Sequence, residues 1–139
     1  MSGPPADRVP FEYAVLRVVP RIERGEAINV GVLVYCQAMG YLGARTQVDA
    51  ARLVALDPAA DVATIERAVA AAADCTRHDG DDAGRRFRWL TAPRSTVVQP
   101  GPVHTGLTAD PDADADRLLA LLVLPITAQP GARPPAPDA

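Results

Sequence analysis

The chain has 139 residues and a formal net charge of -3, and all 14 of its basic residues are arginine. This length suits one domain with a modest core and leaves no room for a second. Domains that bind nucleic acid through their overall charge carry a clear basic excess, so the charge balance argues against that class and leaves only a local basic patch.

The cysteine content and the termini indicate a cytoplasmic protein that does not associate with membranes. Cys36 and Cys75 have neither metal-type spacing nor the density of a secreted disulfide scaffold. The first residues lack the pattern of a signal peptide, and the longest apolar run, 118–126, is about half of what a bilayer requires. We expect a flexible N-terminus over 1–10, one α+β domain over 11–126 and a disordered Pro/Ala-rich tail over 127–139.

The first third of the chain predicts a β-meander. Residues 11–19 and 27–36 are rich in Val, Ile, Leu and Tyr and are bounded by Pro or Gly, which is typical of strands paired as an antiparallel hairpin. A third strand is expected over 41–48. Strict alternation along the second strand predicts one core face and one mixed face. The core face would hold Ile28, Val30, Val32 and Val34, and the mixed face Ala27, Asn29, Gly31, Leu33 and Tyr35.

The middle of the chain predicts two helices and then a loop. Asp49 is placed to cap a short helix over 50–56, and Asp61 to begin an amphipathic one over 62–76. The polar stretch 77–84 is typical of an exposed loop. The helices would pack on the sheet.

The last part of the chain mixes short strands with a final helix. Aromatic, basic and proline residues interleave over 85–100, which favours short edge strands and turns. A helix is expected over 112–124. We therefore predict an α+β fold in which two main helices pack on an antiparallel sheet of four or five strands.

Two groups of polar residues are candidates for a binding surface. The first contains Arg17, Arg24, Glu26 and Asn29, which could form an anion-binding or protein-binding surface with Gly31, or a structural Arg–Glu pair and a capping amide. The second is a basic run with interleaved aromatics, which could bind phosphate and stack a base. Its alternative is an arginine-rich edge with Trp89 in the core beside Leu90. It comprises Arg85, Arg86, Phe87, Arg88, Trp89 and Arg94.

Metal binding and catalysis have weaker signals. Aspartates at alternate positions from Asp110 to Asp116 resemble the opening of a calcium loop, but Ala115 and Leu121 stand where such a loop needs Gly and Glu, so acidic helix capping explains them as well. A hydroxyl of Ser95 or Thr96 acting with His104, as in a small hydrolase or transferase, is a minor alternative, because no catalytic motif surrounds these residues. We expect no cofactor, no metal site and no catalytic residues.

Two sequence blocks resemble a known family. They are Tyr13-Ala-Val-Leu-Arg-Val-Val-Pro20 with Arg24-Gly-Glu-Ala-Ile-Asn-Val-Gly-Val-Leu-Val-Tyr35, and Phe87-Arg-Trp-Leu-Thr-Ala-Pro-Arg-Ser-Thr-Val-Val-Gln99 with Pro102-Val-His-Thr-Gly106. The stretch from Tyr13 to Val123 is similar to the bacterial domain of unknown function family 3037, which has no established activity.

The resemblance implies an accessory or regulatory domain that partners a HipA-like serine/threonine kinase. It also favours a functional surface made from both blocks, and anion, nucleotide or nucleic-acid binding remains the alternative. The candidate surface comprises Arg17, Arg24, Glu26, Asn29, Arg88, Trp89, Arg94, Ser95, Thr96 and Gln99.

Overall fold

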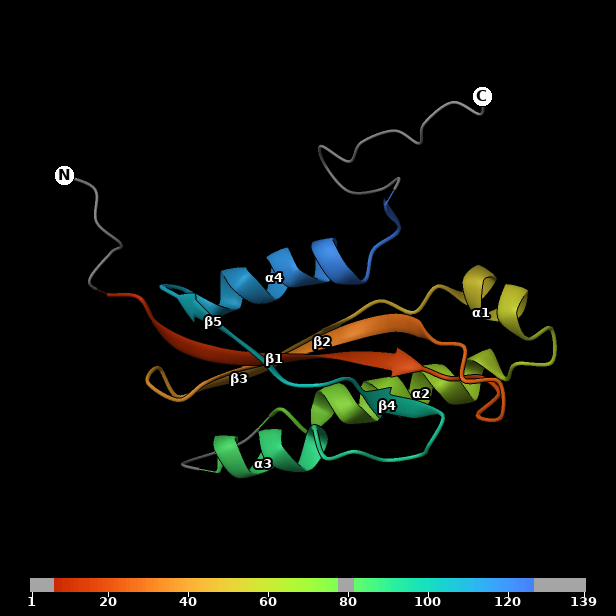
Figure 1. Ribbon diagram of the computed structural model, residues 1–139, viewed down its shortest axis with the longest axis horizontal. Helices are drawn as coiled ribbons and strands as arrows, with labels where there is room; N and C mark the ends of the chain where they lie inside the picture. Colours follow the sequence, from red (N-terminus) through yellow and green to blue (C-terminus); the bar gives the residue numbers. More distant parts are fainter. Residues whose placement is uncertain (1–6, 78–81, 127–139) are drawn as a thin grey trace.

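The computed structural model describes residues 7–77 and 82–126, which form a five-stranded antiparallel sheet with helices on both faces (Figure 1). The strands are β1 (Val9–Val18), β2 (Ile28–Cys36), β3 (Tyr41–Thr46), β4 (Val98–Pro100) and β5 (His104–Thr108). The helices are α1 (Ala50–Leu56), α2 (Val62–Asp74), α3 (Ala83–Leu90) and α4 (Pro111–Leu122). The α+β class and the N-terminal meander are confirmed.

Strand β1 lies at the centre of the sheet's connectivity. It pairs with β2 along one side, and β2 pairs with β3. Along its other side β1 pairs with two short segments, β5 near its beginning and β4 near its end. These two segments therefore share one edge of the sheet, and β3 forms the opposite edge.

Each face of the sheet carries its own hydrophobic core. Helix α4 covers one face, where Ala115 and Leu118 pack with Phe11, Val32 and Val34. Helices α2 and α3 lie on the opposite face, and α1 lies at the end of the sheet with Leu53 in the same core (Figure 1). We call these two sides the α4 face and the α2–α3 face.

A β-bulge changes the predicted alternation of β2. Leu16 pairs with Gly31 but Arg17 pairs with Asn29, so Val30 is the extra residue. In the part of β2 before the bulge, each side chain therefore points to the opposite face from the one that regular alternation with Val32 and Val34 predicts. Ile28 therefore belongs to the core of the α2–α3 face.

The prediction that β2 has one core face was wrong, because helices cover both faces of the sheet at this strand. Val32 and Val34 pack in the core of the α4 face, whereas Val30 and Leu33 pack in that of the α2–α3 face. Gly31 likewise pairs with Leu16 and does not share the face of Asn29.

Aspartate side chains begin three of the helices, as expected from the sequence. Asp49 accepts from the Arg52 N–H, Asp61 from the Thr64 N–H and Asp110 from the Ala113 N–H. Each carboxylate satisfies a backbone donor that the first helical turn leaves free.

The segment after 82 is partly different from the prediction. Short strands and turns were expected over 85–100, and β4 is such a strand, but Ala83–Leu90 is the helix α3. Ala83, Phe87 and Leu90 recur at helical spacing and are all buried. The alternative that placed Trp89 in the core was wrong, because this residue lies off the buried stripe and has 60% of its surface exposed.

Some boundaries also differ. Strand β1 begins at Val9, within the segment 1–10 that was expected to precede the domain, and residues 1–6 lie outside the described residues. The loop predicted over 77–84 falls largely on 78–81, outside the described residues, and Ala83 and Gly84 belong to α3. The predicted tail, 127–139, also lies outside the described part of the chain.

Helix α4 is anchored to β3 by an ion-pair network. Arg45 donates through Nε to Asp116 at 2.7 Å and through Nη2 to Asp112 at 2.7 Å. The Tyr41 hydroxyl donates to the same Asp112 oxygen at 3.0 Å. With Asp110 capping the helix and Asp114 paired to Arg117, each of the four alternating aspartates has a structural partner.

Gly31→Ala should destabilise the fold. A Cβ at this position would lie 2.9 Å from the Arg45 carbonyl oxygen and 2.9 Å from the Thr46 methyl group, so β3 would have to move. We expect a loss of about 1–3 kcal/mol in urea unfolding. Gly101→Ala is the control, because its Cβ would meet only the Val15 carbonyl oxygen at 3.5 Å; equal losses in both variants would contradict the close-approach argument.

The anchoring of α4 should weaken in acid. Hydrogen bonds from Arg45 and then Tyr41 lower the pKa of Asp112, so its contribution to stability is present above the unfolded-state pKa and is lost as pH falls through the lower folded-state pKa. The pKa of Arg45 is raised by its bonds to Asp116 and Asp112, so it stays charged.

We therefore expect the difference in unfolding free energy between the wild type and Arg45→Met to shrink as pH falls from neutral to below about 4. Arg52→Met, on the exposed side of α1, provides the control. A difference between wild type and Arg45→Met that stays constant from pH 7 to pH 2 would show that the carboxylates contribute nothing to anchoring.

Candidate functional site

The first polar block forms a row across three strands on the α4 face. Arg17 of β1 pairs with Asn29 of β2 on one side and with Gln99 of β4 on the other. The Asn29 Nδ2 donates to the Leu122 carbonyl oxygen at 2.9 Å, which ties β2 to the last turn of α4. Arg17 is half-buried, and no carboxylate within residues 7–77 and 82–126 forms an ion pair with it. The structure thus brings together three of the predicted residues.

Arg24 and Glu26 pair with each other in the turn between β1 and β2. The Arg24 Nε donates to Glu26 Oε1 at 2.5 Å, and this bond lowers the pKa of Glu26 and raises that of Arg24. Gly25 between them has a φ of 69°, a left-handed conformation that favours glycine. The pair therefore matches the structural alternative for these two residues.

The second block places an arginine over an exposed tryptophan. Trp89 lies on α3, and Arg94 folds back so that its guanidinium carbon is 4.9 Å from the ring centroid. The Arg94 Nη2 donates to the Trp89 carbonyl oxygen, and its Nε donates to the Ala92 carbonyl oxygen at 3.3 Å. A cation at the C-terminus of α3 is favourable because the unpaired carbonyl groups there are partly negative.

Arg88, Ser95 and Thr96 also belong to the second block, but no contact joins them to the Trp89–Arg94 pair among the interactions of the described residues. Arg88 is exposed on α3, and Ser95 is exposed in the segment that leads to β4. The Thr96 hydroxyl donates to the Val98 carbonyl oxygen at 2.7 Å. Thr96 therefore helps to shape the edge of the sheet.

The two blocks lie on opposite faces of the sheet. Arg17, Asn29 and Gln99 face α4, whereas Trp89 and its companion Arg94 lie on the side of α2 and α3. Of the second block, only Gln99 lies beside the first. Its neighbour Val98 packs on the α2–α3 face, and successive side chains of a strand point to opposite faces, so Gln99 faces α4 beside Arg17. The proposed single surface from both blocks is thus divided by the sheet.

A hydroxyl–imidazole pair is excluded by strand register. His104 pairs with Tyr13, whereas Val98 pairs with Val18, five residues further along β1. That separation is roughly 16 Å at the rise of a strand. Thr96 lies beyond Val98 in the same direction, so neither it nor Ser95 comes within hydrogen-bond reach of His104.

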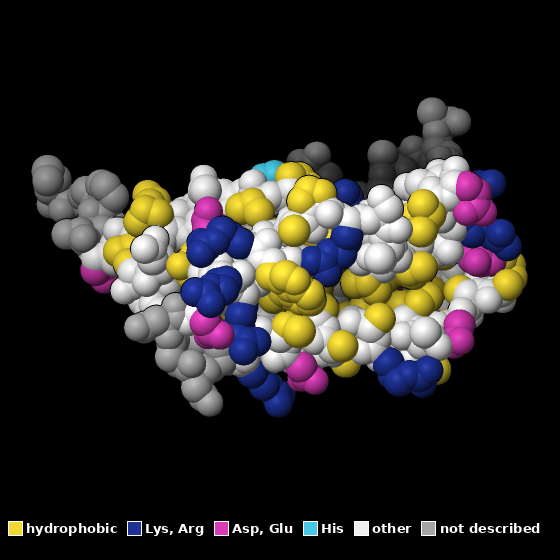
Figure 2. Space-filling model, turned by 90° about the horizontal axis from the view of Figure 1, so that it is seen from below, with side chains coloured by type: hydrophobic (Ala, Val, Ile, Leu, Met, Phe, Trp, Pro, Cys, Tyr) yellow, Lys and Arg dark blue, Asp and Glu magenta, His cyan; other side chains and the backbone are white. Residues whose placement is uncertain are grey.

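Two hollows lie on the α2–α3 face, beside the second block. A groove of about 420 Å³ runs between the N-terminal half of α2 and the segment 96–98. A second hollow, of about 370 Å³, is lined by Cys75, Arg85, Arg86 and Trp89. Figure 2 shows this side of the molecule, where hydrophobic side chains gather around a hollow and arginine side chains flank them.

The groove itself was not predicted from the sequence. Its walls are mostly apolar, and it also contains the nearly buried Asp57, of which 8% is exposed. The walls come from three separate parts of the chain. The lining residues are Pro20, Asp57, Ala59, Ala60, Asp61, Thr64, Ile65, Ala68, Thr96, Val97 and Val98. The only local signal was Asp57-Pro58, which marks the end of α1.

The described residues show no group of three or more His, Cys, Asp or Glu side chains placed to hold a metal ion. In the same part of the chain, no helix is both long and apolar enough to cross a membrane. What the α2–α3 face offers is an exposed tryptophan with a stacked arginine and an apolar groove.

The structure is a small α+β domain with an open antiparallel sheet, one face of which carries an exposed tryptophan stacked with an arginine. The family model described as protein of unknown function (DUF3037) matches residues 13–123, and the chain belongs to this family. No curated protein and no solved structure matched in the corresponding comparisons.

Arg94→Ala should uncover the Trp89 ring without unfolding the protein. Trp89 is the single tryptophan, so its fluorescence reports this site alone. We expect stronger quenching by acrylamide in the variant, because the guanidinium no longer covers one ring face, with stability within about 1 kcal/mol of the wild type. Arg52→Ala, on α1, is the control; unchanged quenching in Arg94→Ala would show that the stacked arrangement is not populated in solution.

Proposed function

We propose that this protein is a non-enzymatic accessory domain that binds another protein through its α2–α3 face. The observation that carries the proposal is the position of Trp89, which has 60% of its surface in solvent although the fold has a core beneath the same helix. Tryptophan and arginine dominate the binding energy of protein interfaces. Here both types stand next to each other, and the apolar groove lies on the same face.

The main-chain edge beside the groove favours recognition through side chains. The outward carbonyl group of Val98 already accepts from the Thr96 hydroxyl, and Pro100 has no N–H to donate. Such an edge resists pairing with a further strand. A partner would therefore be held by contacts with Trp89, Arg94 and the groove.

The proposed partner is a HipA-like serine/threonine kinase, as the resemblance of the two sequence blocks to the family suggests. Two free cysteines, Cys36 and Cys75, are compatible with the reducing cytoplasm in which we place this complex. The role would be regulatory, through a change in the partner's activity or localisation.

Anion or nucleic-acid binding is the second candidate, supported by Arg85 and Arg88. Both are exposed on α3 near Trp89 and have no ion-pair partner among the described residues. Binding through these arginines would weaken steeply as salt rises, whereas binding through Trp89 and the groove would not. Salt dependence therefore separates the two candidates.

Trp89→Ala should weaken the complex with the kinase by about 2 kcal/mol or more, since a central interface tryptophan is a typical hot spot. The measurement is co-purification and calorimetric titration with a HipA-like serine/threonine kinase. Leu121→Ala is the matched control, because Leu121 is 55% exposed on α4, on the other face of the sheet. No complex at micromolar concentrations, or equal affinities for both variants, would overturn the proposal.

A further inference from the structure

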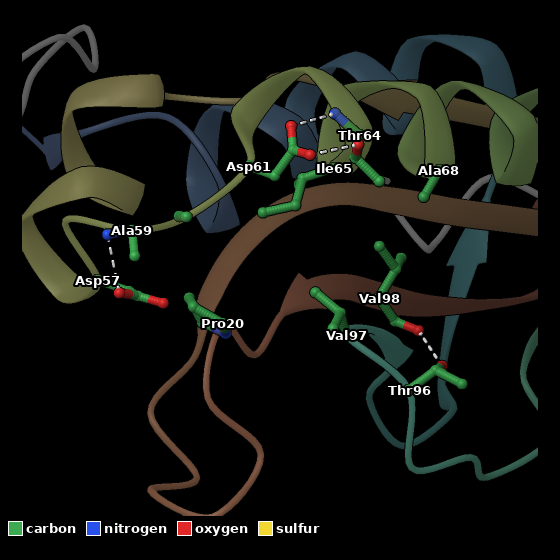
Figure 3. Close-up of a pocket in the computed structure, with 11 residues that line it drawn as sticks. Pro20, Asp57, Ala59, Asp61, Thr64, Ile65, Ala68, Thr96, Val97 and Val98 are labelled. Carbon is green, nitrogen blue, oxygen red and sulfur yellow. Dashed lines mark hydrogen bonds between the residues drawn. The ribbon is translucent and has the colours of Figure 1, made fainter.

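The groove on the α2–α3 face ends in a carboxylate that the fold does not fully use. Asp57 Oδ1 accepts from the Ala59 N–H at 3.0 Å and lies 3.5 Å from Arg21 Nη2. No hydrogen bond from the described residues reaches Oδ2, which points away from Ala59 toward the open space facing Pro20 (Figure 3). A carboxylate oxygen is thus directed into an otherwise largely apolar groove by a residue that is 8% exposed.

The structural role of Asp57 accounts for only one of its oxygens. The residue ends α1, and the bond from Oδ1 to the Ala59 N–H fixes the turn that follows. An asparagine would keep that bond through its own side-chain oxygen. The negative charge is therefore not needed for the turn.

The second carboxylate in the groove is different, because both of its oxygens are occupied. Asp61 Oδ1 accepts from the Thr64 N–H at 3.1 Å, and Oδ2 accepts from the Thr64 hydroxyl at 2.7 Å (Figure 3). These bonds lower the pKa of Asp61, which keeps it ionised. Asp61 thus adds negative charge to the groove but offers no free acceptor comparable to Asp57 Oδ2.

Arg21 balances this charge only in part. Its side chain is half exposed, and its guanidinium is shared between Asp57 and Glu23 at 3.5 Å each. Three carboxylates, Asp57, Asp61 and Glu23, lie near two cations, Arg21 and the Arg67 guanidinium beside Asp61, so one negative charge remains in excess. An additional positive charge at Asp57 Oδ2 would be favourable.

The walls of the groove indicate what kind of group would fit beside a cation bound at Asp57. Ile65, Ala68, Val97 and Val98 offer an apolar surface, and the Thr96 hydroxyl is already bonded to Val98. An aliphatic chain that ends in a cation matches an apolar wall that ends in a carboxylate. A single free oxygen suits the point charge of an ammonium group better than the two-pronged guanidinium of arginine.

We infer that the groove is the specificity pocket of the partner-binding face and that it takes a lysine side chain of the partner protein. The alkyl stem lies along Ile65 and Val98, and the ammonium group binds Asp57 Oδ2. This inference rests on the proposed protein-binding function. The occupant cannot be a lysine of a second copy, because the chain contains none.

The experiment titrates ¹⁵N-labelled full-length protein with short peptides and follows the amide signals of the groove. The probes are acetyl-Ala-Lys-Ala-amide, its norleucine and arginine analogues, and n-pentylammonium. The proteins are the wild type, Asp57→Asn and Asp61→Asn. Both substitutions remove one charge and retain an oxygen that can accept the capping N–H, so they form a matched pair.

We expect the lysine peptide to bind the wild type about tenfold or more tightly than the norleucine peptide, as a charge-assisted hydrogen bond implies. It should also bind more tightly than the arginine peptide. Asp57→Asn should abolish the preference for lysine over norleucine, while Asp61→Asn should retain most of it.

Four results would overturn the inference. Equal binding of lysine and norleucine peptides, or an unchanged preference in Asp57→Asn, would show that the groove does not select a cation. Tighter binding of the arginine peptide would assign the pocket to a different side chain. Binding of n-pentylammonium alone, with the peptides excluded, would indicate a free amine as the ligand.

The peptide titration does not involve the kinase, so the two proposals can fail separately. Selective lysine binding without a kinase complex would remove the proposed partner and keep the pocket. A kinase complex that depends on Trp89 but not on Asp57 would keep the interface and remove the lysine assignment.

Discussion

The β-bulge at Leu16 and Arg17 is the constraint on which the arrangement of both faces depends. In a regular hairpin, alternation would direct Ile28 and Val34 to the same side of the sheet. The extra residue, Val30, reverses the alternation, so Ile28 packs under α2 and α3 while Val34 packs under α4. The same reversal directs Asn29 toward the last turn of α4 and keeps its amide out of an apolar core. A one-residue shift thus determines which polar groups reach which surface.

The two halves of the sheet differ in how helix α4 covers them and in the length of their edge strands. Strands β2 and β3 lie under α4, and β3 approaches β2 closely at Gly31 while Arg45 ties it to α4. The half formed by β1, β4 and β5 includes a short, interrupted edge. The groove lies beside that edge, where β4 meets the N-terminal half of α2. Helices α2 and α3 contact β2 and β3 as well, so the groove lies where these helices reach the interrupted edge.

The sequence was sufficient to predict the meander, three helices and their aspartate caps, since these follow from local patterns. It did not predict α3, although Ala83, Phe87 and Leu90 have helical spacing, because the helix is short and precedes Pro93. The bulge was missed because it depends on pairing between strands. One of the two alternatives for Trp89 placed it in the core, and the helix stripe places Phe87 there instead.

The candidate surface could be predicted only as two separate groups of residues. Whether the groups meet depends on which side of the sheet each one occupies, and that is decided by the bulge and by α3. The groove was beyond prediction for a related reason. Its walls come from the turn after β1, the start of α2 and the segment before β4, which only tertiary packing brings together.

The first polar block has a structural explanation throughout. Arg24 pairs with Glu26 in the turn, and Asn29 bonds to the end of α4. Arg17 lies next to Asn29 on the α4 face, where the partly negative end of that helix favours a cation. This block therefore explains how the two layers are joined.

The second block has no such explanation. Burying Trp89 would stabilise the protein more than exposing it, yet the chain places Phe87 in the core and covers one face of the indole with Arg94. Nearby, Thr96 and Pro100 block the main-chain edge of β4, while Asp57 leaves an oxygen directed into the groove. Pairing of a further strand with the edge of β4 is therefore disfavoured, whereas Trp89 and the groove on the same face remain accessible to side chains. Under the proposed function, such a surface would select a partner by the shape and charge of the side chains that the partner inserts.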